Sequence, residues 1–399
     1  MYRKSSHSSR FGRRPSRFGG HRGSSRSGGR KHASFKDVSK FINKATPIVD
    51  VEPYKPVNSF ASFAIDQRLK DNVLSSKYVH PTPIQDQAIP TILSGSDLVG
   101  IANTGTGKTA AFVIPLIDKV ARDRNQKILI MAPTRELAIQ IDQELRKFAF
   151  GMQIFSVCAV GGAPISWQMK DLRRSYNFLI GTPGRLKDLL ERRCFSLDSF
   201  QTVVLDEADR MLDMGFINDM RALISAMPKY HQTLFFSATL SADIKRIINE
   251  FLKNPVNISV KTGDTAKSVD QDVIYVRGAQ KIDLLHELLI KPEFNKVLIF
   301  GRTKHGVERL SNTLKEKGLK VGSIHGDKNH NQRQSSLRAF KDNIINVLVA
   351  TDVAARGLDI PNVTHVINYE LPATHEDYIH RIGRTGRAGK AGIALTFID

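Results

Sequence analysis

Short apolar runs alternate with amphipathic stretches along most of this chain, in two separate series. A strand buried on both faces reads as a continuous apolar run, and alternation of such runs with helical spacings is typical of βαβ units and a parallel sheet. At 399 residues the chain is long enough for more than one core. The pattern therefore predicts two α/β lobes with parallel sheets and a cleft between them.

The first series begins at Phe60 and closes near Val260. Its predicted strands are 97–102, 127–133, 154–160, 178–182, 202–206 and 233–237. A helix is predicted after the second strand, because a cap residue precedes four apolar residues at helical spacing. These residues are Thr134, then Leu137, Ile141, Leu145 and Phe148.

Residues 261–270 contain Val269 as their only large apolar residue, which indicates a linker between the lobes. The second series follows, with predicted strands at 273–276, 296–300, 320–324, 346–350, 365–368 and 393–398. The predicted segments are a tail and connector at 1–57, an entry region at 58–86, lobes at 87–260 and 271–399, and the linker.

The chain carries a formal net charge of +20, and residues 1–34 contain ten basic residues and no acidic one, the first acidic residue being Asp37. Residues 1 to about 34 are rich in Ser, Gly and Arg with interspersed aromatic residues, a composition too polar to bury a core. We expect this tail to be disordered and to bind RNA through phosphate contacts and base stacking. A solubilising tail is the alternative. Residues 35–57, with Pro47, Pro53 and Pro56, predict an extended connector.

No apolar run approaches the roughly 20 residues that span a bilayer, and the N-terminus lacks the apolar core of a secretory signal. The two cysteines, Cys158 and Cys194, form no metal-binding or disulfide pattern, so a reducing compartment is expected. These features predict a cytoplasmic protein.

The predicted strand 97–102 runs into a glycine-rich loop that is followed at once by a helical pattern. Glycines let backbone N–H groups converge on phosphate oxygens, and a helix N-terminus favours negative charge. Lys108 is expected at the β- and γ-phosphates and the Thr109 hydroxyl at Mg²⁺. Ala102 stands where the strict motif has its first glycine. The predicted phosphate-binding residues are Thr104, Gly105, Thr106, Gly107, Lys108 and Thr109.

The apolar run 203–205 ends in a cluster of carboxylates, Asp206, Glu207 and Asp209. Open α/β sheets place ligands at the carboxyl edge of their strands, and clustered charges there call for a cation. We expect Asp206 to hold Mg²⁺, through water, and Glu207 to orient and deprotonate the attacking water. Asp209 is expected to tie the site to neighbouring elements. In isolation, a strand that ends in a solvated acidic turn would be the better explanation of Asp-Glu-Ala-Asp at 206–209.

Further motifs accompany these two. They are Pro-Thr-Pro-Ile-Gln at 81–85, Pro-Thr-Arg-Glu-Leu-Ala at 133–138, the Gly161-Gly162 pair, Thr-Pro-Gly-Arg at 182–185, Asp-Glu-Ala-Asp at 206–209 and Ser-Ala-Thr at 237–239. In this order they resemble the DEAD-box family of superfamily 2 ATP-dependent RNA helicases, over roughly residues 58–399. The core looks bacterial, with an Arg/Gly/Ser-rich tail. The resemblance implies two RecA-like P-loop domains, with ATP and Mg²⁺ as cofactors.

By this resemblance Phe60 and Gln85 form a Q motif that reads adenine. A Gln amide both donates and accepts hydrogen bonds, which suits the N6/N7 edge of adenine and favours ATP over GTP. Asp209, Ser237 and Thr239 are implied in coupling. The RNA-binding residues implied in the first lobe are Pro133, Thr134, Arg135, Gly161, Gly162, Thr182 and Arg185.

The second lobe has no phosphate loop and is expected to complete a site. The resemblance makes Arg384 and Arg387 arginine fingers for the γ-phosphate, and His380 a coupling residue; an RNA-binding basic patch is the alternative. Gly357 and Asp359 are implied at the nucleotide. The implied RNA-binding residues of this lobe are Arg302, Thr303, Gly326 and Thr351. Asn329-His330 departs from the family's usual Ser-Gln, whereas Arg333 is retained.

We therefore expect RNA-stimulated ATP hydrolysis coupled to cleft closure and local duplex unwinding or remodelling, with sequence-tolerant contacts to the RNA backbone. The chain ends about where its last predicted strand ends, so further RNA targeting is expected from the tail or a partner protein. Two alternatives remain: an ATP-dependent RNA clamp or assembly factor that unwinds little, and a DNA-directed helicase.

Overall fold

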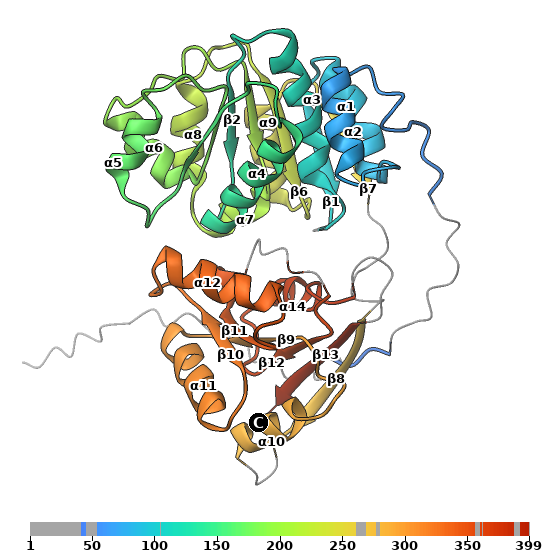
Figure 1. The fold of residues 1–399 in the computed structure, drawn as a ribbon, viewed down its shortest axis with the longest axis vertical. Helices are drawn as coiled ribbons and strands as arrows, with labels where there is room; N and C mark the ends of the chain where they lie inside the picture. Colours follow the sequence, from blue (N-terminus) through green and yellow to red (C-terminus); the bar gives the residue numbers. More distant parts are fainter. Residues whose placement is uncertain are drawn as a thin grey trace, which may run out of the picture. The chain divides into compact units, whose positions relative to one another are not determined.

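Two parallel β-sheets flanked by helices form the described part of the protein (Figure 1). The computed structural model describes residues 41–44, 54–103, 105–260, 269–276, 280–355, 360, 362–386 and 392–398. Within this part, the strand order is β3-β4-β2-β5-β6-β1-β7 in the first sheet and β10-β11-β9-β12-β13-β8 in the second. The predicted architecture of two parallel α/β lobes is confirmed.

The first lobe has seven strands and nine helices among the described residues. The strands are β1 Leu98–Ala102, β2 Ile128–Met131, β3 Ser156–Ala159, β4 Phe178–Gly181, β5 Thr202–Leu205, β6 Gln232–Ser237 and β7 Val256–Val260. The helices are α1 Gln67–Ser75, α2 Pro83–Leu93, α3 Lys108–Arg122, α4 Arg135–Phe148, α5 Ile165–Asp171, α6 Pro183–Glu191, α7 Ala208–Asp213, α8 Ile217–Ser225 and α9 Ala242–Phe251.

Apolar side chains on both faces of the first sheet explain why its strands are continuous apolar runs. In β2, Ile128 and Ile130 enter one core cluster, whereas Leu129 and Met131 enter the other. Helices α1–α4 pack in the first cluster, and residues of α6–α9 pack in the second. The central strands are buried along their whole length, as a parallel sheet covered on both faces requires.

The second lobe repeats this architecture with six strands and five helices among its described residues. The strands are β8 Val269–Tyr275, β9 Val297–Gly301, β10 Val321–Ile324, β11 Val347–Thr351, β12 His365–Asn368 and β13 Gly392–Ile398. The helices are α10 Lys281–Leu289, α11 Lys304–Glu316, α12 His330–Lys341, α13 Asp352–Ala355 and α14 His375–Ile382.

Three local differences separate the structure from the sequence prediction. Strand β7 was not predicted, because at this edge of the sheet only Ile258 of its residues is buried. Strand β8 begins at Val269, so the last two residues of the expected linker belong to the second sheet, while 261–268 lie outside the described residues. Residues 41–44 fall within the span expected to be an extended connector, yet Asn43 pairs with Gln271 of β8.

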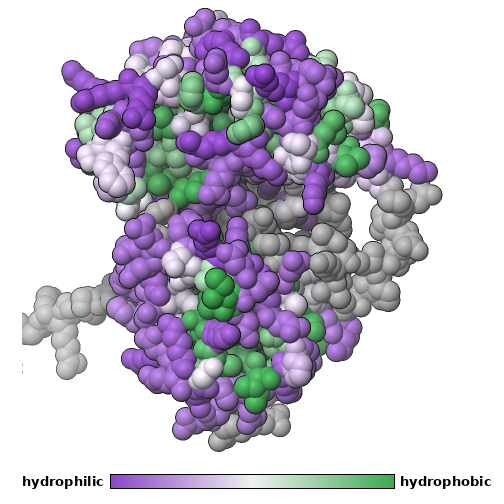
Figure 2. Space-filling model, in the orientation of Figure 1, coloured by the Kyte–Doolittle hydropathy of each residue, from purple (hydrophilic) through white to green (hydrophobic). Residues whose placement is uncertain are grey.

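The surface of each lobe is mainly hydrophilic in the view of Figure 2, with apolar side chains in small patches. Among the described residues, no helix is both long and apolar enough to cross a bilayer. Cys158 and Cys194 are both free thiols, and burial raises the pKa of Cys158 to about 12.

Candidate ATP and RNA sites of the two lobes

The glycine-rich loop joins β1 to α3 and depends on backbone conformations that suit glycine. Gly105 and Gly107 have φ angles of +82° and +89°, which side-chain-bearing residues rarely adopt. A Cβ atom on Gly107 would also overlap the amide of Gln85. The loop therefore needs glycine at position 107 for two independent reasons. Thr104 lies outside the described residues.

Gln85 anchors this loop to the start of α2. Its Nε2 donates to the carbonyl oxygen of Gly107 (3.0 Å), and its Oε1 accepts from the backbone N–H of Thr82 (2.9 Å). The Thr82 hydroxyl donates to the carbonyl oxygen of Thr106 at 2.8 Å. The Gln85 amide thus binds the phosphate loop directly, and its adenine contact stays a prediction.

The ring of Phe60 has no exposed surface. It packs edge-on against Phe63 and Tyr78, with ring centroids 5.8 and 5.9 Å away. The structure therefore gives Phe60 a packing position that fixes the segment before α1. Asp86, which the sequence did not single out, accepts hydrogen bonds from Tyr54 and Asn58 and holds the chain across the start of α2.

Lys108 and Thr109 lie in the first turn of α3, where unpaired N–H groups and the helix dipole favour an anion. The Lys108 ammonium is buried and donates to the carbonyl oxygen of Ala102 at 2.8 Å. It lies close enough to lower the pKa values of Asp206 and Asp209. The lysine and the acidic strand end therefore occupy one site.

Asp206 follows β5 and is 2% exposed. Its pKa is raised to about 7, because the effect of burial, together with the repulsion from Glu207, outweighs the attraction of Lys108. A nearby cation would offset this cost of burying a carboxylate, so the site fits Mg²⁺. Among the described residues no cluster of three His, Cys, Asp or Glu could hold a metal alone. Mg²⁺ needs only one or two protein ligands when phosphates and water complete its shell.

Glu207 is buried and adopts a left-handed backbone conformation with φ of +51°. Such a conformation costs energy for a residue other than glycine and is concentrated at functional sites. Its Oε2 accepts a 2.6 Å bond from Nη1 of Arg210, and both side chains are almost fully buried. Arg210 therefore fixes the direction of the Glu207 carboxylate, a role that the sequence did not reveal.

Asp209 joins the acidic strand end to the next strand of the sheet. Its Oδ2 accepts from the backbone N–H groups of Ala238 and Thr239, both at 3.0 Å, and from the Thr239 hydroxyl at 3.2 Å. The Ser237 hydroxyl donates to the carbonyl oxygen of Thr239 at 2.8 Å. Burial alone would raise the pKa of Asp209, but Lys108, Arg210 and hydrogen bonding lower it. The predicted coupling residues of this lobe thus form one hydrogen-bonded group.

The first-lobe residues expected at RNA gather at the ends of β2, β3 and β4, which are adjacent in the sheet. Pro133, Thr134, Arg135, Gly161, Thr182 and Arg185 all line one hollow. Thr134 and Thr182 are the N-cap residues of α4 and α6, so two helix N-termini open at this place. The ATP residues follow β1, β5 and β6, so the sheet order separates the two groups along one edge.

The glycine pair after β3 makes room for an arginine. A Cβ atom on Gly162 would overlap the Arg135 guanidinium, and Gly162 has a φ of +77°. Arg185 donates to Oε1 of Gln168 at 3.1 Å. These contacts hold both arginines beside the two helix N-termini.

The second-lobe residues expected at RNA follow β9 and β10 and end β11, again three adjacent strands. Arg302 and Gly326 are exposed, whereas Thr351 is buried. Thr303 caps α11 through the backbone N–H of Gly306 at 3.0 Å. Asn329 caps α12 in the same way, accepting from Gln332 at 2.9 Å, so the departure at 329 has a structural use.

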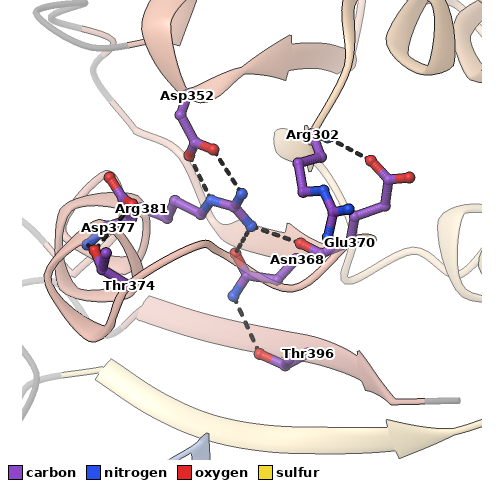
Figure 3. Close-up of polar contacts among 8 residues, drawn as sticks. All are labelled: Arg302, Asp352, Asn368, Glu370, Thr374, Asp377, Arg381 and Thr396. Carbon is purple, nitrogen blue, oxygen red and sulfur yellow. Dashed lines mark hydrogen bonds and ion pairs between the residues drawn. The ribbon is translucent and has the colours of Figure 1, made fainter. Parts of the chain in front are cut away.

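Arg381 is 1% exposed and joins three segments of the second lobe (Figure 3). Its guanidinium makes a double contact with Asp352, at 2.5 and 2.7 Å. Its Nη1 donates to Oδ1 of Asn368 at 3.1 Å and to the carbonyl oxygen of Glu370 at 2.7 Å. The Glu370 carboxylate in turn accepts from the backbone N–H of Arg302. Arg381 therefore fixes α14 relative to the ends of β9, β11 and β12.

Arg384 lies one turn beyond Arg381 and is 4% exposed, and His380 is half-buried. Arg387, Gly357 and Asp359 lie outside the described residues, so their predicted roles stay predictions.

A second group missed by sequence reasoning surrounds His325. Glu308 accepts from the Ser323 hydroxyl (2.6 Å) and from Nε2 of His325 (3.0 Å). Burial alone would raise the pKa of Glu308, but these bonds and Lys328 lower it to about 2. Nothing in the spacing of these residues along the chain indicates this contact.

Comparison with known proteins identifies the family of this chain. Residues 82–247 match the DEAD/DEAH box helicase model, and residues 280–389 match the helicase conserved C-terminal domain. An ATP-dependent RNA helicase CshA of Listeria monocytogenes is 45% identical over 345 residues, which are 86% of this chain and 66% of that protein. The Bacillus subtilis DEAD-box ATP-dependent RNA helicase CshA is 45% identical over 342 residues, 85% of this chain and 69% of the relative. The chain thus spans about two thirds of the length of these curated relatives.

Solved structures of RNA-bound helicases are similar to this chain in fold and sequence. Saccharomyces cerevisiae Dbp5 bound to RNA and ADP BeF3 is 31% identical, with a TM-score of 0.75, over 85% of this chain and 89% of that one. Mss116p bound to ssRNA and AMP-PNP is 32% identical, with a TM-score of 0.78, over 86% of this chain and 75% of that one. Fold, motifs and similarity agree that the chain belongs to the DEAD-box family of ATP-dependent RNA helicases.

Proposed function

We propose that this chain hydrolyses ATP with Mg²⁺ and uses the cycle of binding and hydrolysis to open short RNA duplexes. One observation carries the proposal: the nucleotide group and the RNA group lie along the same edge of one parallel sheet, on adjacent sets of strands. Ligands of open α/β sheets bind at this edge. Both ligands can therefore act on the same lobe at once.

Each residue of the nucleotide group has a chemical task. Lys108 and the N–H groups of the loop and α3 bind the β- and γ-phosphates. Thr109 and Asp206 hold Mg²⁺, which neutralises charge on the phosphate oxygens. Glu207, oriented by Arg210, positions the attacking water and accepts its proton. Arg384 and Arg387 of the second lobe stabilise the charge of the transferred phosphoryl group.

RNA binding and hydrolysis are coupled because ATP and RNA both bind better to a closed arrangement of the two lobes. Each ligand then favours the binding of the other. Helix N-termini and arginines at the RNA group contact phosphate and sugar, so binding tolerates any sequence. Loss of the γ-phosphate removes the arginine contacts and reopens the protein. The similar Dbp5 and Mss116p structures each hold RNA together with a nucleotide analogue, which supports both ligands.

The site of action that we propose is the cytoplasm, and the basic tail is proposed to add RNA affinity. The ten basic residues within residues 1–34 support RNA binding by the tail, and the two free thiols agree with a reducing compartment such as the cytoplasm.

The test is ATP turnover by the full chain with RNA, with DNA of the same sequence, and without nucleic acid. We expect stimulation by RNA and little by DNA. Lys108→Ala removes a charged phosphate contact and should lower RNA-stimulated turnover by at least about 10²-fold. Lys147→Ala, an exposed lysine of α4, is the matched control and should turn over normally.

Two outcomes would oppose the proposal. Normal turnover by Lys108→Ala would show that the assignment of the loop as the phosphate-binding site is wrong. Equal stimulation by DNA would favour a DNA-directed enzyme. Strand displacement from a short RNA duplex separates unwinding from clamping: turnover and tight binding without displacement would make the protein an ATP-dependent RNA clamp.

A further inference from the structure

A short segment that precedes the first lobe, residues 41–44, packs against the second lobe. The backbone N–H of Asn43 donates to the carbonyl oxygen of Gln271 at 3.0 Å, and the N–H of Gln271 donates back at 2.8 Å. This reciprocal pair is one antiparallel bridge, formed on β8 at the edge of the second sheet. Figure 1 shows residues 41–44 as a separate blue segment in an otherwise grey stretch of chain.

Phe41 fixes the same segment through its side chain. Its ring is 1% exposed and meets the ring of Tyr378 edge-on, with centroids 4.9 Å apart. The Tyr378 hydroxyl donates to Oε1 of Gln271 at 2.9 Å. Gln271 therefore binds Asn43 through its backbone and Tyr378 through its side chain, so the bridge and the aromatic contact form one unit.

Lys44 and Ile42 contribute less to this packing. Lys44 and Asp270 are 3.8 Å apart, and the Lys44 side chain is 78% exposed, so the pair adds little binding. The side chain of Ile42 is 46% exposed. The Phe41 ring and the Asn43 backbone thus make the buried and hydrogen-bonded contacts of the segment with the second lobe.

The helix on which Phe41 packs is the one that leads to the proposed arginine finger. Tyr378 lies in α14, three residues before Arg381, and residues three apart are neighbours on a helix surface. Arg381 ties α14 to Asp352 and Asn368, and Arg384 follows it by one turn. A contact with Tyr378 therefore bears directly on the placement of Arg384.

We propose that Phe41 and Asn43 are positioning residues for ATP hydrolysis: by docking on β8 and Tyr378 they hold α14 so that Arg384 reaches the transferred phosphate. The inference rests on the proposed role of Arg384. Residues 41–44 precede both matched family models, which cover 82–247 and 280–389. The positioning contact is thus supplied by a part of the chain that the family models do not describe.

The first test is steady-state ATP turnover by full-length Phe41→Ala at saturating RNA. Because Arg384 acts on the transition state, a misplaced finger should lower kcat by at least about tenfold, with the KM for ATP unchanged. Phe41→Leu keeps an apolar side chain at the site and should restore most of kcat. Ile42→Ala, the neighbouring apolar residue with an exposed side chain, should behave as the parent protein.

Hydrogen exchange in the parent protein and in Asn43→Pro tests docking itself. We expect the amides of Asn43 and Gln271 to be protected in the parent, and Gln271 to exchange faster once proline removes the Asn43 donor. Free exchange at both amides in the parent protein would overturn the proposal. So would a Phe41→Ala variant whose thermal midpoint falls while its kcat stays at the parent value, because the contact would then serve stability alone.

These outcomes are separable from failure of the proposed function. If Arg384→Ala abolishes turnover while Phe41→Ala leaves it intact, the positioning inference fails and the ATPase assignment stands. If the parent protein shows no RNA-stimulated turnover, the assignment itself fails.

Discussion

Glu207, the proposed catalytic base, lies next to Asp206, has a left-handed backbone conformation, and accepts a bond from Arg210 at one of its oxygens. Glu207→Gln keeps the size of the side chain and an oxygen for Arg210, but it cannot take a proton from water. We expect turnover to fall by about 10²–10⁴-fold, while ATP and RNA binding persist. ATP hydrolysis and fluorescence anisotropy of labelled RNA measure the two effects.

The matched control for this prediction is Glu191→Gln, because Glu191 is exposed at the end of α6 in the same lobe. It should hydrolyse ATP at the parent rate. If Glu207→Gln also turned over normally, another group would have to accept the proton, and the assignment of Glu207 as base would be wrong.

The roles of single residues could be predicted where neighbouring residues in the sequence indicate them. They could not be predicted where the partner of the residue lies far away in the sequence. Thr134 precedes an apolar helical repeat and does cap α4. Asp209 lies in an acidic cluster and does bind the group after β6. Arg381 and Glu308 are charged residues whose partners come from other elements, so neither spacing nor residue type indicates that they are held in networks.

Among the secondary-structure elements, the strands that could be predicted from the sequence are those whose side chains are buried on both faces of the sheet. Strands covered on both faces, such as β2 and β9, are apolar throughout and were predicted within one or two residues. Strand β7 and the bridge at Asn43 lie at sheet edges, where pairing depends on backbone hydrogen bonds and few side chains are buried. The sequence pattern therefore does not predict β7 or the bridge at Asn43.

We expect the buried contacts of Arg381 with Asp352, Asn368 and Glu370 to stabilise the second lobe. Arg381→Met removes the guanidinium and leaves the Asp352 carboxylate without its partner, which should lower the free energy of unfolding of this lobe by about 3–5 kcal/mol. Adding Asp352→Leu should recover part of the loss, because the unpaired charge is gone. Arg338→Met, whose side chain is 86% exposed, should have little effect.

Denaturant unfolding can follow the two lobes separately. The only tryptophan, Trp167, lies in α5 of the first lobe, so its fluorescence reports that lobe, whereas circular dichroism reports both. The Arg381→Met transition should move earlier by circular dichroism and stay in place by fluorescence. Equal stability of Arg381→Met and the parent would mean that the network is not a structural support.

In the whole molecule, positive charge is divided between two parts. The ten basic residues within residues 1–34 account for half of the net charge of +20, and the other +10 belongs to the rest of the chain. Affinity for a polyanion falls with salt according to the number of phosphates that the protein neutralises. The two parts should therefore contribute separately to the salt dependence of RNA binding.

Deleting residues 1–34 tests this division and leaves Phe41 and Asn43 in place. RNA binding should weaken, and the slope of log affinity against log salt should flatten by about 0.7 for each phosphate of a single strand that the tail neutralises. A full-length control with all ten basic residues changed to Gln keeps the length of the tail and should reproduce the effect, since charge is the cause. ATP turnover at saturating RNA should stay near the parent value, because the ATP group lies entirely beyond residue 34. An unchanged salt slope in both variants would show that the tail makes no phosphate contacts and serves solubility instead.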